Sequence, residues 1–338
     1  MAKIAFFEVQ PWEKTLIETV AKRLKADIFP QEVEAALNQA RNYEIISCFI
    51  YSDLSSKNLR KLPQLKLIAT RSTGMDHIDL NYCQQHQITV ANVPSYGENT
   101  VAEHAFALIL AISRRITEAV ARVRQGGFSP AGLTGFDLKG KTLGVVGVGH
   151  IGRYMVKIAN GFGMKVLGVA RHPDQQLARR LKFRYVTLEA CLRQADIVSL
   201  HVPLTKSTFH LINRQNIKLM KRGSILINTS RGPVVETEAI LWALEEGILA
   251  GTGLDVLEEE ENLDRPEKLF DPYLSTDDLK ELVAAHLLRE KPNVLITPHN
   301  AFNTQEAIGR IIKTTEANIR QFLQSLPIRR SKRLQIGQ

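Results

Sequence analysis

The sequence has few cysteines and no long hydrophobic run. Cys48, Cys83 and Cys191 are odd in number and far apart, and none belongs to a C-x-x-C pattern. We expect buried free thiols in a reducing compartment, not a disulfide framework. The first apolar run, Ile4 to Phe7, is too short for a signal-peptide core, and no other run approaches the length of a membrane span. We therefore expect a cytoplasmic protein without a membrane partner.

Motifs for metal or nucleic-acid binding are also missing. No spacing of Cys, His, Asp and Glu matches a metal site, so no metal is expected. The formal net charge is +9, but the excess is spread along the chain apart from residues 329–333. Residues 258–281 are acidic, with ten Asp or Glu against three Lys or Arg. Because no basic helix and no aromatic RNA-binding pattern is present, we expect a surface that attracts small anions rather than a nucleic-acid partner.

The length of 338 residues is sufficient for two domains with separate cores. Short β-branched runs alternate with amphipathic stretches, which predicts βαβ units and parallel sheets. Helices are expected at 12–24, 98–124, 236–246, 276–288 and 304–326. Residues 258–292 are expected to form an inserted loop that contains the helix at 276–288. The expected strands are 3–9, 44–52, 65–72, 88–93, 141–149, 165–170, 196–203, 224–230, 249–256 and 293–298.

A glycine-rich turn follows the fifth expected strand. It reads Gly147-Val148-Gly149-His150-Ile151-Gly152, and a helix and a second strand complete a unit of about 30 residues. The first glycine forms the tight turn, the second lets a pyrophosphate approach the backbone, and the third lets the helix pack on the strand. The helix N-terminus then offers amides and partial positive charge to phosphates. This context predicts a dinucleotide-binding domain.

The end of the second strand in this unit lacks the expected carboxylate. NAD-binding units carry an acidic residue there for the ribose hydroxyls, but this chain has Ala170, 18 residues after Gly152, followed by Arg171 and His172. An Asp would repel a 2′-phosphate, whereas an arginine binds phosphate well. We therefore expect NADP to be preferred. If Arg171 points to solvent, either NADP or NAD would be accepted.

Three further segments lie at the ends of successive expected strands and carry Arg231, Asp255 with four glutamates, and His299. Since doubly wound sheets bind ligands at the carboxyl ends of their strands, these groups are expected to lie at one edge. An imidazolium can protonate the oxyanion formed when hydride reaches the carbonyl of a 2-oxo acid. A nearby carboxylate would stabilise and orient it, and a guanidinium would bind the substrate carboxylate.

The motifs together resemble the D-isomer-specific 2-hydroxyacid dehydrogenases, nearest the D-lactate dehydrogenase branch. The resemblance covers nearly the whole chain, from ATRSTGMDHIDL through ANVPSYGENTVAEHAFALIL, LGVVGVGHIGR, LINTSRGPVV and GLDVLEEE to TPHNAF. It implies two Rossmann-like doubly wound α/β domains with parallel sheets. Residues 1–99 and 300–338 would form a flavodoxin-like substrate-binding domain, and residues 100–299 the inserted dinucleotide-binding domain.

The resemblance also assigns roles. Arg231 would bind substrate, His299 would be the acid/base, and Glu260 its carboxylate partner, although Glu258 or Glu259 would replace it if the register of the glutamate run differed. His104 is expected to pack or to lie in an interface. The expected substrate residues are Thr73, Gly74, Met75, Tyr96 and Phe302, and the remaining expected cofactor residues are His201, Pro203 and Asp255.

Three functions are compatible with this pattern. The first is reduction of a pyruvate-like 2-oxo acid to the D-2-hydroxy acid, and the second is the same chemistry on glyoxylate or hydroxypyruvate. The third is a dinucleotide-sensing binding module like the transcriptional corepressors that resemble this family. The resemblance also implies a homodimer formed through the nucleotide domain, with the helix expected from Glu98 taking part.

Overall fold

The chain folds into two compact units in the computed structural model, which describes residues 2–258, 260, 263 and 275–325. Unit 1 comprises Met1–Tyr96 and Asn303–Gln338, and unit 2 comprises Gly97–Phe302. Each boundary lies three residues from the position expected from the sequence. Phe302, which is only 8% exposed, falls in unit 2 and directly follows Ala301, whose N–H donates to the Asp255 carboxylate.

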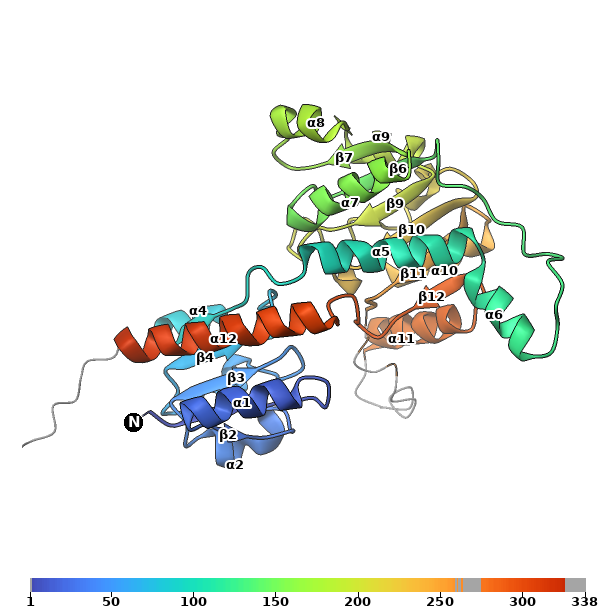
Figure 1. The fold of residues 1–338 in the computed structure, drawn as a ribbon. Coiled ribbons are helices and arrows are strands. Elements are labelled where there is room, and N and C mark those ends of the chain that lie inside the picture. Colours follow the sequence, from blue (N-terminus) through green and yellow to red (C-terminus); the bar gives the residue numbers. More distant parts are fainter. Residues whose placement is uncertain (1, 259, 261–262, 264–274, 326–338) are drawn as a thin grey trace, which may run out of the picture. The chain divides into compact units, whose positions relative to one another are not determined.

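Unit 1 is a five-stranded parallel sheet in the order β2-β1-β3-β4-β5. The last helix, α12, packs against this sheet (Figure 1). Its Ile308, Ile312 and Ile319 belong to the apolar cluster that contains Phe6 and Leu67 of the sheet. The C-terminal helix α12 therefore completes the hydrophobic core that the N-terminal strands of unit 1 form. The elements are β1 (Ile4–Phe6), α1 (Lys14–Leu24), β2 (Asp27–Ile28), η1 (Glu34–Ala36), α2 (Leu37–Ala40), β3 (Ile45–Cys48), α3 (Ser56–Leu59), β4 (Leu67–Thr70), α4 (Leu80–Gln85), β5 (Thr89–Ala91) and α12 (Gln305–Ser325).

Unit 2 is a seven-stranded parallel sheet in the order β12-β11-β10-β9-β6-β7-β8. The strand order reverses between β6 and β9, which is where doubly wound sheets bind nucleotides. Helices cover both faces, so the strands read as continuous apolar runs. The elements are α5 (Glu98–Ser113), α6 (Ile116–Arg124), β6 (Thr142–Val146), α7 (His150–Gly161), β7 (Lys165–Val169), α8 (Gln175–Leu181), β8 (Arg184–Tyr185), α9 (Leu188–Gln194), β9 (Ile197–Leu200), η2 (Ile217–Leu219), β10 (Ser224–Asn228), η3 (Gly232–Val234), α10 (Thr237–Glu245), β11 (Leu249–Leu254), α11 (Thr276–Arg289) and β12 (Val294–Ile296).

The two parallel-sheet α/β domains confirm the expected fold class, but the single helix expected over 98–124 is wrong. It is two helices, α5 and α6, which meet at an angle in Figure 1. Arg115 adopts a left-handed backbone, φ 51°, and Phe136 donates its N–H to the carbonyl of Ser113. The helix stops because a segment more than twenty residues further along the chain takes one of its last carbonyl groups, a contact that helical periodicity does not reveal.

The segment expected as an inserted loop contains a helix that belongs to the domain architecture. Leu282, Ala285 and Leu288 of α11 are fully buried, and the helix packs on α10 (Figure 1). It is thus the crossover helix between the parallel strands β11 and β12. Residues 264–274 of the acidic stretch lie outside the described residues. In the described part of the chain, no helix combines the length and apolar character that a membrane span needs.

Candidate active site

The glycine-rich turn of unit 2 has the geometry that a pyrophosphate requires. Gly147 has a φ of 97°, and a Cβ there would lie 2.5 Å from the carbonyl oxygen of His201, so β6 and β9 approach closely at the reversal of strand order. At Gly149 an added Cβ would meet nothing within 4 Å, which leaves open space before the first turn of α7. A Cβ at Gly152 would lie 2.2 Å from the Gly147 carbonyl, so helix and strand pack tightly. The cradle fits a dinucleotide.

His150 and Ile151 begin α7 beside this open space. His150 is exposed, with its Nδ1 3.9 Å from a carboxylate oxygen of Glu98, and Ile151 is half-buried against the core of unit 2. Their backbone N–H groups belong to the first turn of α7, where a helix has no intrahelical acceptor for its donors. These amides are available to phosphate oxygens.

Ala170, Arg171 and His172 follow β7 directly. Arg171 and His172 are exposed, and within the described residues neither side chain forms a hydrogen bond or ion pair. A carboxylate is therefore missing where NAD-binding units place one, and a guanidinium stands next to that position. This end of the site can accept additional negative charge.

His201 lies at the end of β9, on the other side of the strand reversal. Its Nε2 is 2.8 Å from the Ser199 hydroxyl, and its Nδ1 is buried without a partner among the described residues. Burial lowers the pKa of His201 to about 3, so the ring is neutral at physiological pH. A neutral, partly buried imidazole suits a structural or cofactor-proximal position and not proton transfer. Pro203, two residues on, is exposed.

The three segments with candidate catalytic groups follow β10, β11 and β12, which are adjacent in the sheet. The segments after β11 and β12 meet directly: Nδ1 of His299 is 2.8 Å from Oε1 of Glu260. The other carboxylate oxygen of Glu260 accepts the N–H of Leu257. Both side chains remain partly accessible, 21% for His299 and 29% for Glu260. The carboxylate holds the Nδ1 side of the ring, which leaves Nε2 to exchange a proton with a substrate.

Asp255 accepts several hydrogen bonds from the loop that carries His299. Its side chain is 1% exposed, and its two oxygens accept the N–H groups of Asn300, at 2.8 Å, and Ala301, at 2.9 Å, together with the hydroxyl of Thr297. The backbone N–H of His299 donates to the carbonyl of Asp255. His299 itself has a φ of 48°, a left-handed conformation that is unfavourable for a residue with a Cβ. The bonds to Asp255 are what keep this conformation in place.

Glu258, the alternative partner considered for His299, has a different role. It is 3% exposed; one oxygen lies 2.5 Å from Nε2 of His210, and the other accepts both the N–H and the hydroxyl of Thr237 at the start of α10. Apart from the glutamate run, no sequence pattern indicates this network. The structure thus pairs Glu260 with His299, while Glu259 lies outside the described residues.

Arg231 follows β10 on a loop that packs against the glutamate-bearing segment. Its guanidinium donates to the carbonyl of Ser230 at 2.8 Å, and its own carbonyl accepts the Asn228 side-chain amide. Next to it, a Cβ on Gly232 would lie 2.0 Å from the Leu257 carbonyl oxygen. No side chain fits between the two segments, so their spacing is fixed by backbone contact.

The expected substrate residues Thr73, Gly74 and Met75 form a loop after β4 in unit 1. Thr73 donates to the carbonyl of Val93 at 2.7 Å, and Ser72 donates to the carbonyl of Gly74 at 2.6 Å, so side-chain hydrogen bonds order the loop. Arg71, just before the loop, is fully buried and forms an ion pair with the equally buried Glu13 at 2.8 Å.

Tyr96 and Phe302 are the other two residues expected to contact substrate. Tyr96 is the last residue of the N-terminal part of unit 1, and its carbonyl accepts a hydrogen bond from the Arg310 guanidinium of α12. Phe302 ends unit 2. Their substrate contacts stay a prediction.

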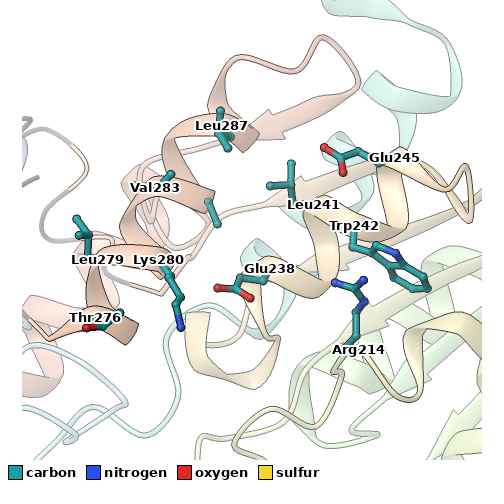
Figure 2. Close-up of a pocket in the computed structure, with 11 residues that line it drawn as sticks. Arg214, Glu238, Leu241, Trp242, Glu245, Thr276, Leu279, Lys280, Val283 and Leu287 are labelled. Atoms are coloured by element: carbon teal, nitrogen blue, oxygen red, sulfur yellow. The ribbon is translucent and has the colours of Figure 1, made fainter.

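A cavity of about 590 Å³ lies elsewhere in unit 2, between α10 and α11 (Figure 2). Leu279, Val283 and Leu287 of α11 line one wall and Trp242 of α10 the other, with the Arg214 guanidinium 4.2 Å from the centre of the Trp242 ring. None of the residues expected in the active site lines it.

Comparison with known proteins agrees with this geometry. Residues 106–301 match the family described as the D-isomer-specific 2-hydroxyacid dehydrogenase, NAD-binding domain. The chain is 38% identical to a glyoxylate reductase of Thermococcus litoralis over 85% of this chain and 82% of that protein. It is 34% identical to the D-lactate dehydrogenase of Escherichia coli over 94% and 95%. The crystal structure of D-lactate dehydrogenase from Aquifex aeolicus, complexed with NAD and lactic acid, superposes with a TM-score of 0.85 at 37% identity, covering 95% and 96%.

A nucleotide cradle and a paired histidine and carboxylate at the carboxyl ends of strands in one parallel sheet are typical of a nicotinamide-dependent oxidoreductase. The matches place it further: the chain belongs to the D-isomer-specific 2-hydroxyacid dehydrogenase family. Both the family expected from the motifs and the presence of an NAD-binding domain are confirmed.

Proposed function

We propose that the protein reduces a small, pyruvate-like 2-oxo acid to the D-2-hydroxy acid, with His299 as the general acid/base. The observation that carries the proposal is the 2.8 Å contact between His299 and Glu260 at the carboxyl edge of the sheet. Glu260 follows β11, which is the neighbour of β10, and Arg231 lies in the segment after β10. Similarity to D-lactate dehydrogenases supports the substrate class.

The residues of this chain divide the chemistry between them. The reduced nicotinamide, when bound, supplies a hydride to the carbonyl carbon. His299 donates the Nε2 proton to the carbonyl oxygen as negative charge develops there. Glu260 accepts the Nδ1–H, which orients the ring and stabilises its protonated form. Arg231 binds the substrate carboxylate and polarises the carbonyl.

We further propose that NADPH is preferred to NADH. Ala170 removes the carboxylate that would repel a 2′-phosphate, and the exposed Arg171 has no competing ion pair among the described residues. The cradle of Gly147, Gly149 and Gly152 serves either cofactor, so the preference depends on the end of β7 alone.

Glyoxylate is the second candidate substrate, favoured by the similarity to glyoxylate reductases. Purified protein with NADPH or NADH is tested against pyruvate, glyoxylate, hydroxypyruvate and longer 2-oxo acids, with turnover followed at the nicotinamide absorbance band and product chirality determined by chiral chromatography. The proposal expects the highest kcat/KM for pyruvate or a close homologue and a D product. No turnover with any 2-oxo acid would contradict it and favour a dinucleotide sensor.

The partner we propose is a second copy of the chain. Helix α6 has no buried residue, and Ile116, Val120 and Val123, at spacings of four and three, are 49%, 43% and 54% exposed. Phe128, just beyond the helix, is 93% exposed. Such an apolar stripe on a surface helix is typical of an interface. Light scattering should give twice the chain mass at micromolar concentration, and a Val120→Glu variant should give a monomer; a monomeric wild type would contradict the proposal.

A further inference from the structure

A histidine on α5 contacts the polar network beneath the candidate acid/base. Nε2 of His104 is 3.0 Å from the hydroxyl of Thr297 and 3.4 Å from Oδ1 of Asp255. The His104 side chain is 19% exposed, whereas that of Asp255 is 1% exposed. The ring thus lies against the carboxylate that accepts the N–H groups of Asn300 and Ala301, directly after His299. The place of His104 on a helix in the sequence pointed only to packing or to an interface.

The directions of the hydrogen bonds follow from the chemistry of the groups. The Asp255 carboxylate can only accept, so the Thr297 hydroxyl donates its single proton to it. The hydroxyl oxygen must then accept from His104, which places a proton on Nε2 of the imidazole ring. The order is therefore His104 to Thr297 to Asp255, and Asp255 in turn accepts the N–H groups of Asn300 and Ala301.

This chain of bonds joins a strained loop to a rigid element. His299 has a positive φ of 48°, which a residue with a Cβ adopts only where its surroundings hold it. Helix α5 is anchored by Ala102, Ala105 and Phe106, all buried in the core of unit 2. His104 lies between these positions on the same helix, so the hydrogen bond from its ring to Thr297 ties the loop to a helix whose position is fixed.

We propose that His104 is a positioning residue: by donating from Nε2 to Thr297 it fixes Asp255 and, through it, the orientation of the His299 ring. His104 does not itself transfer a proton to substrate, because its Nε2 proton is committed to Thr297. The proposal rests on the function proposed above, in which His299 is the acid/base. It adds a residue that sets the rate of the chemical step without contributing to substrate or cofactor binding.

The test compares two substitutions at the same position. His104→Phe keeps an aromatic ring and removes the donor, whereas His104→Gln restores an N–H donor near the Nε2 position. Misplacing a reacting group by about 1 Å costs roughly 100-fold in rate, so we expect kcat of His104→Phe to fall by about 10- to 100-fold. The KM values for the 2-oxo acid and for the cofactor should stay within about threefold, and His104→Gln should recover most of kcat.

Two further variants sharpen the result. Thr297→Val removes the relay hydroxyl, and in the double variant with His104→Phe the losses should not add, because both break one chain of bonds. Glu103→Gln changes an exposed neighbour on α5 and should leave kcat and KM unchanged. Unchanged kcat in His104→Phe, or equal losses in the Phe and Gln variants, would overturn the proposal.

A readout without turnover separates this proposal from the proposed function. In ¹H–¹⁵N spectra of the histidine rings, assigned by variants, the His299 signals should shift or broaden in His104→Phe and return towards wild type in His104→Gln. A lower melting temperature with unchanged His299 signals would show a merely structural role and refute the proposal. If the wild type reduces no 2-oxo acid but the His299 signals respond as expected, the proposed function fails while the positioning role stands.

Discussion

Replacing Arg171 by serine tests the cofactor preference at a single side chain. The guanidinium is exposed and has no ion-pair partner among the described residues, so its loss leaves no buried charge behind and should not unfold the protein. A charge-assisted hydrogen bond to a solvent-accessible phosphate is worth about 1–2 kcal/mol. Since about 1.4 kcal/mol is a factor of ten, kcat/KM for NADPH should fall by about 5- to 30-fold while that for NADH stays within twofold.

Ala170→Asp tests the same end of β7 by adding a negative charge instead of removing a positive one. The new carboxylate would repel a 2′-phosphate and offer acceptors to the two ribose hydroxyls of NADH. At a separation of about 4 Å and an effective dielectric constant between those of water and the protein surface, the repulsion is about 2–8 kcal/mol for a doubly charged phosphate. We therefore expect the preference to invert, with kcat/KM for NADPH falling at least 30-fold.

The assay is steady-state kinetics with each cofactor at a saturating concentration of 2-oxo acid. Arg193→Ser is the matched control: this arginine is also exposed, but it lies in the last turn of α9, just before β9 begins and hence at the amino edge of the sheet, far from the ligand side. A wild type with equal or higher kcat/KM for NADH would contradict the proposed preference for NADPH. So would an Arg171→Ser variant whose ratio of NADPH to NADH activity matches that of the wild type.

Two other predictions concern stability. Because burial lowers the pKa of His201 to about 3 from the ordinary value of 6.5, the unfolded chain takes up a proton at this residue below pH 6.5 and the folded chain does not. The stabilisation from the neutral His201 ring is complete above pH 6.5 and is lost as the pH falls towards 3, by about 1.4 kcal/mol per pH unit. Between pH 7.5 and pH 5.0, urea unfolding should show a fall in the free energy of unfolding that is about 2 kcal/mol smaller for His201→Gln than for the wild type. Equal falls in the two proteins would contradict the lowered pKa of His201. Gly232→Ala puts a Cβ 2.0 Å from the Leu257 carbonyl oxygen, so the Arg231 loop must move. We expect a lower midpoint of thermal unfolding and a raised KM for the 2-oxo acid. Wild-type values for both would refute the close packing of the two segments.

The elements predictable from the sequence were those that depend on local pattern. The apolar runs predicted every strand of three or more residues, and the glycine turn predicted the start of α7, because these signals lie within a few residues of each other. The two-residue strands β2 and β8 carry no such pattern. The break between α5 and α6 was missed because Phe136, distant in the sequence, takes the Ser113 carbonyl. Likewise, the sequence predicts a helix at 276–288 but not its place as a crossover helix of the sheet, because the buried face of α11 is defined by packing on α10.

The site divides in the same way. The order of motifs along the chain pointed to Arg231, the glutamate run after Asp255 and His299, since parallel strands bring their carboxyl ends to one edge. Only the family resemblance singled out Glu260 within that run. The bonds that hold these groups could not be predicted, because they join residues far apart in sequence: His104 with Thr297, and Glu258 with His210 and Thr237. Buried polar networks of this kind have no periodicity and depend on the completed fold.

In the proposed reaction, His299 supplies the proton for the reduction of a 2-oxo acid. The most direct measurement is the kcat of a His299→Gln variant, with cofactor affinity followed in parallel by the fluorescence of bound NADPH. The account predicts a fall in kcat of about 10²- to 10⁴-fold with unchanged NADPH affinity. A variant that keeps more than about a tenth of the wild-type kcat would contradict it, because the loss would then fall well short of what removing a general acid costs.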